Sequence, residues 1–482
     1  MKKKVGVIGA GVGGLSVAAR LACSGYGVSV FEKLPRCGGR ANIIEDRGFR
    51  FDTGPSFVMM PDFFKEIFES LGLRIDDYLD LKILDVSYKI IYADGQTFTV
   101  YRDSSRTEQE LEKIEKNSSV RFKEFIDQTA KFYYKAKPFL YKSFTPRDLL
   151  DPRLLPLAYH LKVGQTYWQL ACRFFKSEKL RYAFTFEAMF MGVSPYRTPA
   201  FYSIISYADH IQKIYHPMGG MYEIPKALEK LAEFFGAKLN YNCQVESVAP
   251  SGKGYALETS AGSSECDVLV FNADYSYSRN HLLKKVLPDY EYSCSVFLLY
   301  WGLKEKVIGP EHHNLFLCSD LKANLEDIFS DRIDENNFSF YLHVPTVTDR
   351  SLAPENKDIF YILIPTCNLN KFKGDFSRFE DKLKQAVLKR LNKFYGRNFQ
   401  ELIEVEHRFY PRDFVDRYNI MHGATFGLSH TFRQSAFFRP ANFDRDNKNL
   451  YYVGASTQPG GGLPPVIASS KIVADLISEK TA

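Results

Sequence analysis

The chain lacks any apolar run long enough to cross a membrane, and its cysteines are few and scattered. No window in the 482 residues reaches the roughly 18 consecutive apolar residues that a spanning helix requires. The eight cysteines form no C-x-x-C pair, and the ten histidines form no cluster at the spacing of metal ligands. These absences argue against a disulfide framework and a structural zinc site. We expect free thiols in a reducing compartment and no metal.

Signal-peptide features, internal repeats and low-complexity tracts are also missing. Met1 and three lysines precede a strand interrupted by glycines rather than a continuous apolar segment, which predicts a cytoplasmic protein. Tryptophan is rare, with 2 residues, whereas there are 40 Phe and 30 Tyr. This surplus indicates large apolar surfaces or an apolar tunnel, although a Phe-rich core accounts for it equally well. The length exceeds one ordinary core and predicts two or more domains.

The first residues carry the pattern of a dinucleotide-binding βαβ unit. A buried strand is predicted at Val5–Ile8, a G-x-G-x-x-G turn follows at Gly9, Gly11 and Gly14, and a second strand ends at Glu32. The first glycine permits a tight turn, the second lets the backbone approach a pyrophosphate, and the third lets the helix pack closely on the strand. Glu32 can accept both ribose hydroxyls and would repel a 2′-phosphate. The fingerprint alone does not separate NAD from FAD.

A second glycine-rich turn stands near the end of the chain. Residues 450–454 predict a strand, residues 455–466 a loop rich in glycine and proline, and residues 467–477 a helix. This arrangement directs helix N–H groups and the positive end of the helix dipole toward an anion. In a flavoprotein, that anion would be the reduced isoalloxazine.

Between these ends, the pattern changes from α/β to helical and back. We expect a first FAD-binding part at residues 1–103, a helical lobe at 104–217 and a second FAD-binding part at 218–280. A substrate domain of sheet and helix should follow at 281–425, and a last FAD-binding part at 426–482. The nucleotide-binding domain is therefore predicted to be discontinuous, with the helical stretch as an insertion.

Within the helical lobe, the segment 131–181 is basic and rich in aromatic residues. Lysine and arginine outnumber acidic residues by eleven to three. Such a mixture suits an interfacial membrane segment, with cations for headgroups and apolar faces for acyl chains. A solvated helical lobe with ordinary core faces is the alternative, and nucleic acid is disfavoured because no aromatic platform is recognisable. The interleaved apolar residues are Phe132, Tyr133, Tyr134, Phe139, Leu140, Tyr141, Phe144, Leu149, Leu150, Leu154, Leu155, Tyr167 and Trp168.

Several motifs together resemble the bacterial-type carotenoid (phytoene or dehydrosqualene) desaturase family of FAD-dependent oxidoreductases. They lie at residues 9–32, 36–40, 51–56, 349–355, 426–428, 439–440 and 449–464, so the resemblance covers nearly the whole chain. It implies an α/β protein with a Rossmann-like discontinuous FAD-binding domain, an inserted helical, membrane-facing lobe and a substrate domain of mixed or antiparallel sheet. Residues 58–61 are more reminiscent of the branch acting on C30 chains, or of its oxygenase relatives.

The resemblance also implies which residues bind FAD. The ADP half would be held by the first glycine turn, the pyrophosphate by the motif at 36–40, and the isoalloxazine and ribitol by residues near 53–55 and by the C-terminal loop. The residues carried over are Gly9, Gly11, Gly13, Gly14, Glu32, Gly38, Gly39, Arg40, Thr53, Gly54, Pro55, Val245, Gly454, Gly462 and Leu463. Two positions depart from the pattern, because Gln458 replaces an expected His and Ala455 replaces the Asp of many flavoproteins.

The implied activity is FAD-dependent desaturation of an acyclic isoprenoid chain, a hydrophobic carotenoid precursor held by a peripheral membrane protein. An allylic C–C bond would lose hydride to the flavin and a proton to a base, and oxygen or a quinone would reoxidise the flavin. Asp148, Asp151 and His216 are candidate bases, and a solvent-relayed proton is also open. A carotenoid oxygenase or cis–trans isomerase of the same fold remains an alternative, as does an amine-oxidase-like flavoenzyme or a nonenzymatic FAD protein.

Overall fold

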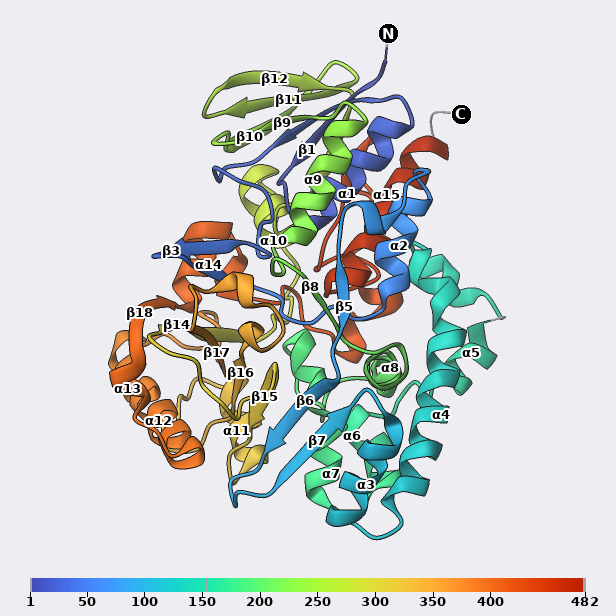
Figure 1. Ribbon diagram of the computed structural model, residues 1–482. Helices are drawn as coiled ribbons and strands as arrows, with labels where there is room; N and C mark the ends of the chain where they lie inside the picture. Colours follow the sequence, from blue (N-terminus) through green and yellow to red (C-terminus); the bar gives the residue numbers. More distant parts are fainter. Residues whose placement is uncertain (1, 153, 480–482) are drawn as a thin grey trace.

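A five-stranded parallel sheet forms one end of the molecule and carries both chain termini nearby (Figure 1). The computed structural model describes residues 2–152 and 154–479. The strand order is β19–β13–β1–β2–β9, and every neighbouring pair is parallel. Three distant stretches of the chain thus build one sheet: β1 (Lys4–Ile8), β2 (Gly27–Phe31), β9 (Lys238–Asn240), β13 (Val268–Phe271) and β19 (Leu450–Tyr452).

Helices cover this sheet, and α1 (Val12–Cys23) packs against both α9 (Glu223–Phe234) and α15 (Leu463–Glu479). Because α1 is enclosed, its residues are small or apolar and almost all buried. Arg20 is the charged exception, and its guanidinium binds Glu66 of α2 (Pro61–Glu69) in a buried ion pair. A three-stranded antiparallel sheet lies beside it, formed by β10 (Val245–Ser251), β11 (Gly254–Thr259) and β12 (Gly262–Cys266).

The second large sheet of the molecule is mixed and has seven strands, in the order β18–β14–β17–β16–β15–β6–β7. Its pairs are antiparallel except β15 with β6, so the hairpin near residue 90 joins this sheet rather than the parallel one. Alternate residues of β14 point to opposite faces, and both faces are buried. The strands are β6 (Val86–Ile91), β7 (Thr97–Tyr101), β14 (Ser295–Leu303), β15 (His313–Phe316), β16 (Phe340–His343), β17 (Asp358–Thr366) and β18 (Ile403–Phe409).

The two faces of this sheet meet different partners. Phe297, Leu299 and Trp301 of β14 pack in the cluster that contains α12 (Ser377–Tyr395). Val296 and Leu298 of β14 belong instead to the largest hydrophobic cluster, which continues into the helical lobe. The apolar stripe of α12 therefore lies in the core, and the opposite sheet face is left for the lobe.

The helical lobe lies at the outer edge of the molecule below the parallel sheet (Figure 1). It contains α3 (Ser104–Ile114), α4 (Ser118–Ala136), α5 (Leu154–His160), α6 (Tyr167–Phe174), α7 (Glu178–Ala183) and α8 (Ile204–Tyr207). Of the aromatic residues in segment 131–181, Phe132, Tyr133, Phe144 and Tyr167 are buried, whereas Tyr134 is exposed. The side chains of Leu149, Leu154 and Leu155 lie outside the described residues. Among the described helices, none has the length and hydropathy needed to span a bilayer.

Short elements connect these layers. The strand pairs β3–β4 and β5–β8 are antiparallel, and β5–β8 joins the helical lobe back to the parallel sheet. Their bounds are β3 (Ile43–Asp46), β4 (Phe49–Asp52), β5 (Leu81–Ile83) and β8 (Tyr215–Pro217). The remaining helices are α10 (Tyr275–Tyr277), α11 (Leu321–Ile328), α13 (Phe399–Leu402) and α14 (Pro411–Tyr418).

Candidate functional site

A large cavity lies where the parallel sheet, the mixed sheet and the helical lobe meet. The cofactor residues expected from the sequence come together along its wall, although they lie far apart in the chain. Those that line it are Gly9, Gly11, Gly13, Glu32, Gly38, Gly39, Arg40, Thr53, Gly54, Pro55, Val245, Gly454, Gly462 and Leu463. Gly14, the remaining expected residue, lies behind this wall in α1.

The glycines of the first turn are required by close backbone approaches. A Cβ atom on Gly14 would lie 2.1 Å from the carbonyl oxygen of Gly9, and one on Gly11 would lie 2.7 Å from Asn272 Oδ1. Gly9 itself has a φ of +101°, in the region that only glycine adopts without strain. The turn is thus shaped to bring bare backbone to the cavity, as a pyrophosphate requires.

Glu32 stands at the end of β2 with its carboxylate already oriented. Its Oε2 accepts a hydrogen bond from the Ala10 N–H at 2.8 Å, and its Oε1 accepts one from the Leu34 N–H at 2.9 Å. Burial raises the pKa of this carboxyl, and the two backbone hydrogen bonds oppose the rise. A carboxylate has about four lone-pair sites, so two remain available for the hydroxyls of a ribose.

Two partly buried groups of opposite charge line the cavity beyond the glycine turn. Arg40 donates from Nη1 to the carbonyl of Thr425 at 2.6 Å, and burial lowers the pKa of its guanidinium. Asp274, which caps α10, has a pKa raised by burial while the charge of Arg40 opposes that rise. Asn272 lies between the glycine turn and the C-terminal loop, donating from Nδ2 to Val453 at 3.2 Å. The only feature of the sequence that points to Asn272 is its position at the polar end of the strand at residues 268–271.

Arg439 organises the C-terminal loop. This fully buried guanidinium donates five hydrogen bonds to backbone carbonyls, and two of them, those of Ala455 and Thr457, belong to residues that line the cavity. Burial lowers the pKa of Arg439 to about 10, so it remains charged at neutral pH. The imidazole of His430 adds a contact, because its Nε2 accepts the N–H of Gly461 at 2.9 Å.

Gln458, which departs from the expected motif, has a structural partner in the helical lobe. Its Oε1 accepts the N–H of Phe144 at 2.6 Å and the hydroxyl of Ser143 at 3.2 Å, and its Nε2 donates to the Phe144 carbonyl at 3.2 Å. The amide therefore fastens the lobe to the loop that lines the cavity. A histidine offers fewer hydrogen-bonding groups and could not make all these contacts at once.

The part of the cavity farther from the glycine turns is apolar. Its lining comes from β14 of the mixed sheet and from the helical lobe and α11, which lie over that face of the sheet. Among the described lining residues, the only acids are Glu32 and Asp274, both at strand ends near the glycine turns. The apolar lining includes Phe186, Met189, Phe190, Val296, Leu298, Leu317, Leu321, Leu325 and Ile328.

The three candidate bases lie elsewhere. Asp148 Oδ2 accepts from the Thr145 N–H and hydroxyl at 2.7 Å, and Lys142 lies 3.1 Å from its Oδ1. These contacts close a capping box and lower the pKa of Asp148. The Asp151 N–H donates to the Asp148 carbonyl. His216 is fully buried in β8, and none of the three is among the described residues that line the cavity.

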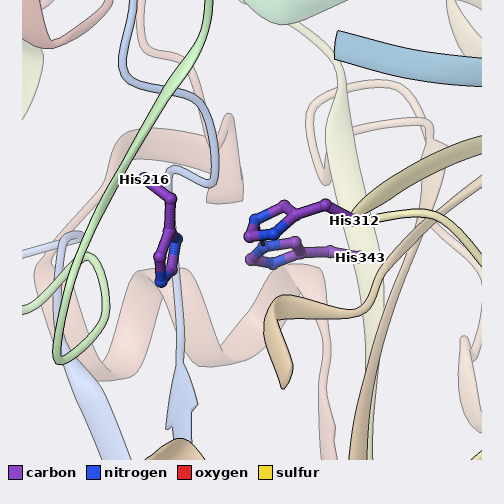
Figure 2. A group of neighbouring side chains, drawn as sticks. All are labelled: His216, His312 and His343. Atoms are coloured by element: carbon purple, nitrogen blue, oxygen red, sulfur yellow. Dashed lines mark hydrogen bonds between the residues drawn. The ribbon is translucent and has the colours of Figure 1, made fainter. Parts of the chain in front are cut away.

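Two groups of buried titratable residues were not recognised in the sequence, because their members are separated along the chain. One joins Glu187, Asp209 and His210 in the helical lobe. Glu187 Oε2 accepts from Ser206 at 2.5 Å and from Tyr167, and burial raises the pKa of Glu187 to about 7. The other joins His216 with His312 and His343, on the face of the mixed sheet that carries Tyr341 and Tyr361 (Figure 2).

A glycine-rich turn, an acidic strand end and a second glycine loop around one cavity define the FAD-binding class of two-domain flavoproteins. Comparison with known proteins agrees. Residues 12–478 match the family described as flavin containing amine oxidoreductase. The zeta-carotene-forming phytoene desaturase of Myxococcus xanthus is 37% identical, covering 98% of this chain and 93% of the relative. A 4,4′-diapophytoene desaturase of Staphylococcus haemolyticus is 34% identical, covering 98% of each chain.

Solved structures show the same fold at low sequence identity. An oxidoreductase from Methanosarcina mazei superposes with a TM-score of 0.63 and 16% identity, covering 98% of this chain and 100% of that one. Cyclohexylamine oxidase from Brevibacterium oxydans gives 0.62 and 15%, covering 100% of both chains. The chain belongs to the flavin containing amine oxidoreductase family, and it is an FAD-dependent oxidoreductase.

Proposed function

We propose that this protein desaturates an acyclic isoprenoid, either phytoene or 4,4′-diapophytoene, in carotenoid biosynthesis. Two relatives of 37% and 34% identity over nearly the full chain bear the names of such desaturases. The observation that carries the proposal is the apolar extension of the cavity. A hydrocarbon needs a lining without charges, whereas a cationic amine would need an acid or an aromatic cage at the reacting end.

The residues around the glycine turns fit FAD. Gly11 and Gly39 present backbone without side chains, Glu32 offers acceptors to the ribose, and Arg40 offers donors to the pyrophosphate. Residues 454–463 would lie against the isoalloxazine and ribitol. When bound, FAD supplies a two-electron acceptor for dehydrogenation of a C–C bond. Oxygen or a membrane quinone would take these electrons in turn.

The chain's own residues have three tasks in this reaction. Leu298 of β14 and Phe190 of the helical lobe enclose the chain from two sides and hold one allylic bond in position, which supplies much of the rate through orientation. The same apolar wall excludes water from the positive charge that develops on the substrate chain during the reaction. Hydroxyls at the cavity wall, on Ser56 and on Tyr341 2.9 Å away, can pass a proton outward.

The test is turnover of defined polyenes by the FAD-loaded protein. The protein is incubated with liposomes containing phytoene or 4,4′-diapophytoene, and the extracted pigment is analysed by absorption and chromatography. We expect a longer conjugated polyene from one of them. Leu325→Trp, which fills the apolar cavity, should abolish turnover and keep bound flavin, whereas the exposed control Val286→Trp should change neither. Colourless substrate returned unchanged, together with oxidation of amines, would reject the proposal.

We further infer that the lobe docks on a membrane surface, where such a substrate resides. The helical lobe lies at the outer edge of the molecule (Figure 1). Large apolar side chains are exposed on its helices and in the turn after α5, among them Tyr134, Leu150, Tyr159 and Val163. Leu150 is 84% and Tyr159 82% exposed, and the surrounding segment is strongly basic. Exposed apolar groups beside cations are what an anionic lipid surface recognises.

Co-sedimentation with vesicles tests this docking. Vesicles containing anionic lipid should bind the wild-type protein, and salt should weaken binding. The double variant Leu150→Ser, Tyr159→Ser should lower the partition coefficient by about ten- to a hundredfold, because each side chain loses roughly 1 kcal/mol or more of burial. The matched variant Phe234→Ser, Val286→Ser removes exposed side chains elsewhere and should bind normally. Equal binding of both double variants would contradict the assignment.

A further inference from the structure

Three buried histidines meet on the face of the mixed sheet that also carries Tyr341 and Tyr361. Those two tyrosines line the cavity, whereas the three histidines are not among its described lining residues. His216 comes from β8, His312 from the residue before β15, and His343 from the end of β16. Their exposed fractions are 0%, 3% and 1%. Figure 2 shows His312 and His343 extending from the sheet toward His216, which stands across from them on the connector. Each histidine offers a ring nitrogen to a group whose members all lie within 4.8 Å of one another.

The distances are close to those of a coordinated metal. His312 Nε2 and His343 Nε2 are 3.0 Å apart. Two imidazole nitrogens bound tetrahedrally at about 2.1 Å from zinc would be roughly 3.4 Å apart. The third nitrogen lies within 4.8 Å of the others, so it needs to approach by at most about 1.4 Å. The ring centroids of His216 and His312 are already only 4.8 Å apart.

The unpartnered nitrogens of the cluster belong to His216. Neither ring nitrogen of His216 has a hydrogen-bond partner among the described residues. Buried polar atoms nearly always have a partner, so these atoms call for a ligand. His312 Nε2 and His343 Nε2 form a 3.0 Å hydrogen bond with each other, and a metal ion would replace that bond as the partner of both nitrogens.

Outer contacts hold the rings in the orientation that ligands need. His312 Nδ1 is 2.7 Å from the hydroxyl of Thr348, which leaves Nε2 for the cluster. His216 Nε2 lies 3.8 Å from Asp349 Oδ2, and that carboxylate is fixed by the N–H of Gly219 at 2.5 Å. Metal-binding histidines characteristically turn their second nitrogen to a carboxylate, hydroxyl or carbonyl in this way.

The chemistry of the three side chains selects the kind of ion. Three neutral imidazoles with one carboxylate nearby suit a borderline divalent cation such as Zn²⁺ rather than Ca²⁺ or Mg²⁺, which prefer oxygen ligands.

We propose that His216, His312 and His343 form a structural site for a divalent transition metal, with Zn²⁺ the preferred ion. The metal would fasten the connector β8 to the strands β15 and β16. Since β8 ends the helical lobe and pairs with β5, the ion would fix the lobe against the mixed sheet. Because the three histidines do not line the cavity, its removal should reduce stability more than binding of flavin.

The experiment is metal analysis of FAD-loaded protein purified without an affinity tag from zinc-supplemented cells. We expect about one zinc per chain in the wild type by mass spectrometry, and less than a tenth in His343→Gln. The control His407→Gln removes a histidine that pairs with Asp46 at the surface and should keep the metal. Zinc-edge X-ray absorption on the wild type should show three imidazole ligands.

Binding should also appear in stability. Adding zinc to chelator-treated protein should raise Tm by about 4 °C at a thousandfold excess over Kd, and not in His343→Gln. Cobalt should give tetrahedral d–d bands at wavelengths beyond the flavin absorption. Wild-type protein that is metal-free and shows neither the Tm rise nor the cobalt bands would overturn the proposal. Equal zinc in His343→Gln would overturn it too. If that variant does not fold, the ligand count and cobalt spectrum of the wild type decide.

Discussion

Replacing Arg439 tests whether one buried guanidinium holds the C-terminal cofactor loop. Its five donors bind the carbonyls of Leu428, Ser429, Gln434, Ala455 and Thr457, at distances from 2.5 to 3.3 Å. Hydrogen bonds from a charged donor contribute about 1.5–3 kcal/mol each before the cost of burying the charge is subtracted. Because Arg439→Met removes that burial cost as well, we expect a net loss of about 3–5 kcal/mol, at the upper end for one substitution.

This loss can be measured as a shift in unfolding temperature. Unfolding entropy is about 2.1 cal/mol/K per residue, so a chain of 482 residues has about 1 kcal/mol/K. The expected fall in Tm is therefore about 3–5 °C for Arg439→Met. Arg439→Lys keeps the charge and at most three donors, so its Tm should lie between those of Arg439→Met and the wild type. Flavin fluorescence, followed during heating, should report earlier cofactor release in the same order.

The control is Arg445→Met, an exposed arginine six residues further along. It should unfold and release flavin like the wild type. If Arg439→Met unfolds within 1 °C of both and retains FAD equally, the five hydrogen bonds do not order the loop, and the reasoning fails.

Three further predictions concern other contacts. Gly14→Ala places a Cβ 2.1 Å from the Gly9 carbonyl, so it should lose FAD by absorption spectroscopy, whereas Gly27→Ala, with 3.8 Å to its nearest neighbour, should keep it. Gln458→Ala should be cleaved by protease within residues 137–150 faster than the control Gln400→Ala, which replaces an exposed glutamine. Equal cleavage rates would mean that Gln458 does not hold the lobe to the C-terminal loop. The pKa of Glu187 in the folded protein, about 7, exceeds the ordinary 4.5, so the stability that this group contributes is lost as pH rises through 7. In Glu187→Gln, Tm should therefore vary less between pH 5 and 8 than in the wild type. The same dependence of Tm on pH in both proteins would refute this.

The residues expected at the nucleotide end come together at the cavity because that end is built from local patterns. Gly9, Gly11 and Glu32 lie within one βαβ unit, where spacing along the chain determines spacing in space. The helix following the C-terminal loop, expected at residues 467–477 and found at Leu463–Glu479, was likewise predicted from a local pattern.

The basic-aromatic segment shows where composition was insufficient. Tyr133 and Tyr134 are neighbours of the same type, yet Tyr133 is 1% exposed and Tyr134 63%. The orientation of the helix about its axis determines which of its side chains face the core and which face solvent, and composition does not contain this information. The interfacial interpretation therefore rests on Tyr134, Leu150 and Tyr159 rather than on the whole segment.

The sequence by itself determined the dinucleotide-binding βαβ unit and the two glycine turns, because backbone approach and dipole direction depend on neighbouring residues. The flavin class followed from motifs spread over nearly the whole chain, since the first turn alone does not separate NAD from FAD. Only the tertiary structure decided the apolar length of the cavity, the five-carbonyl anchor of Arg439 and the meeting of His216 with His312 and His343. These features join residues from separate stretches of the chain. Their distances depend on how the sheets and the lobe pack together, which no single stretch of sequence specifies.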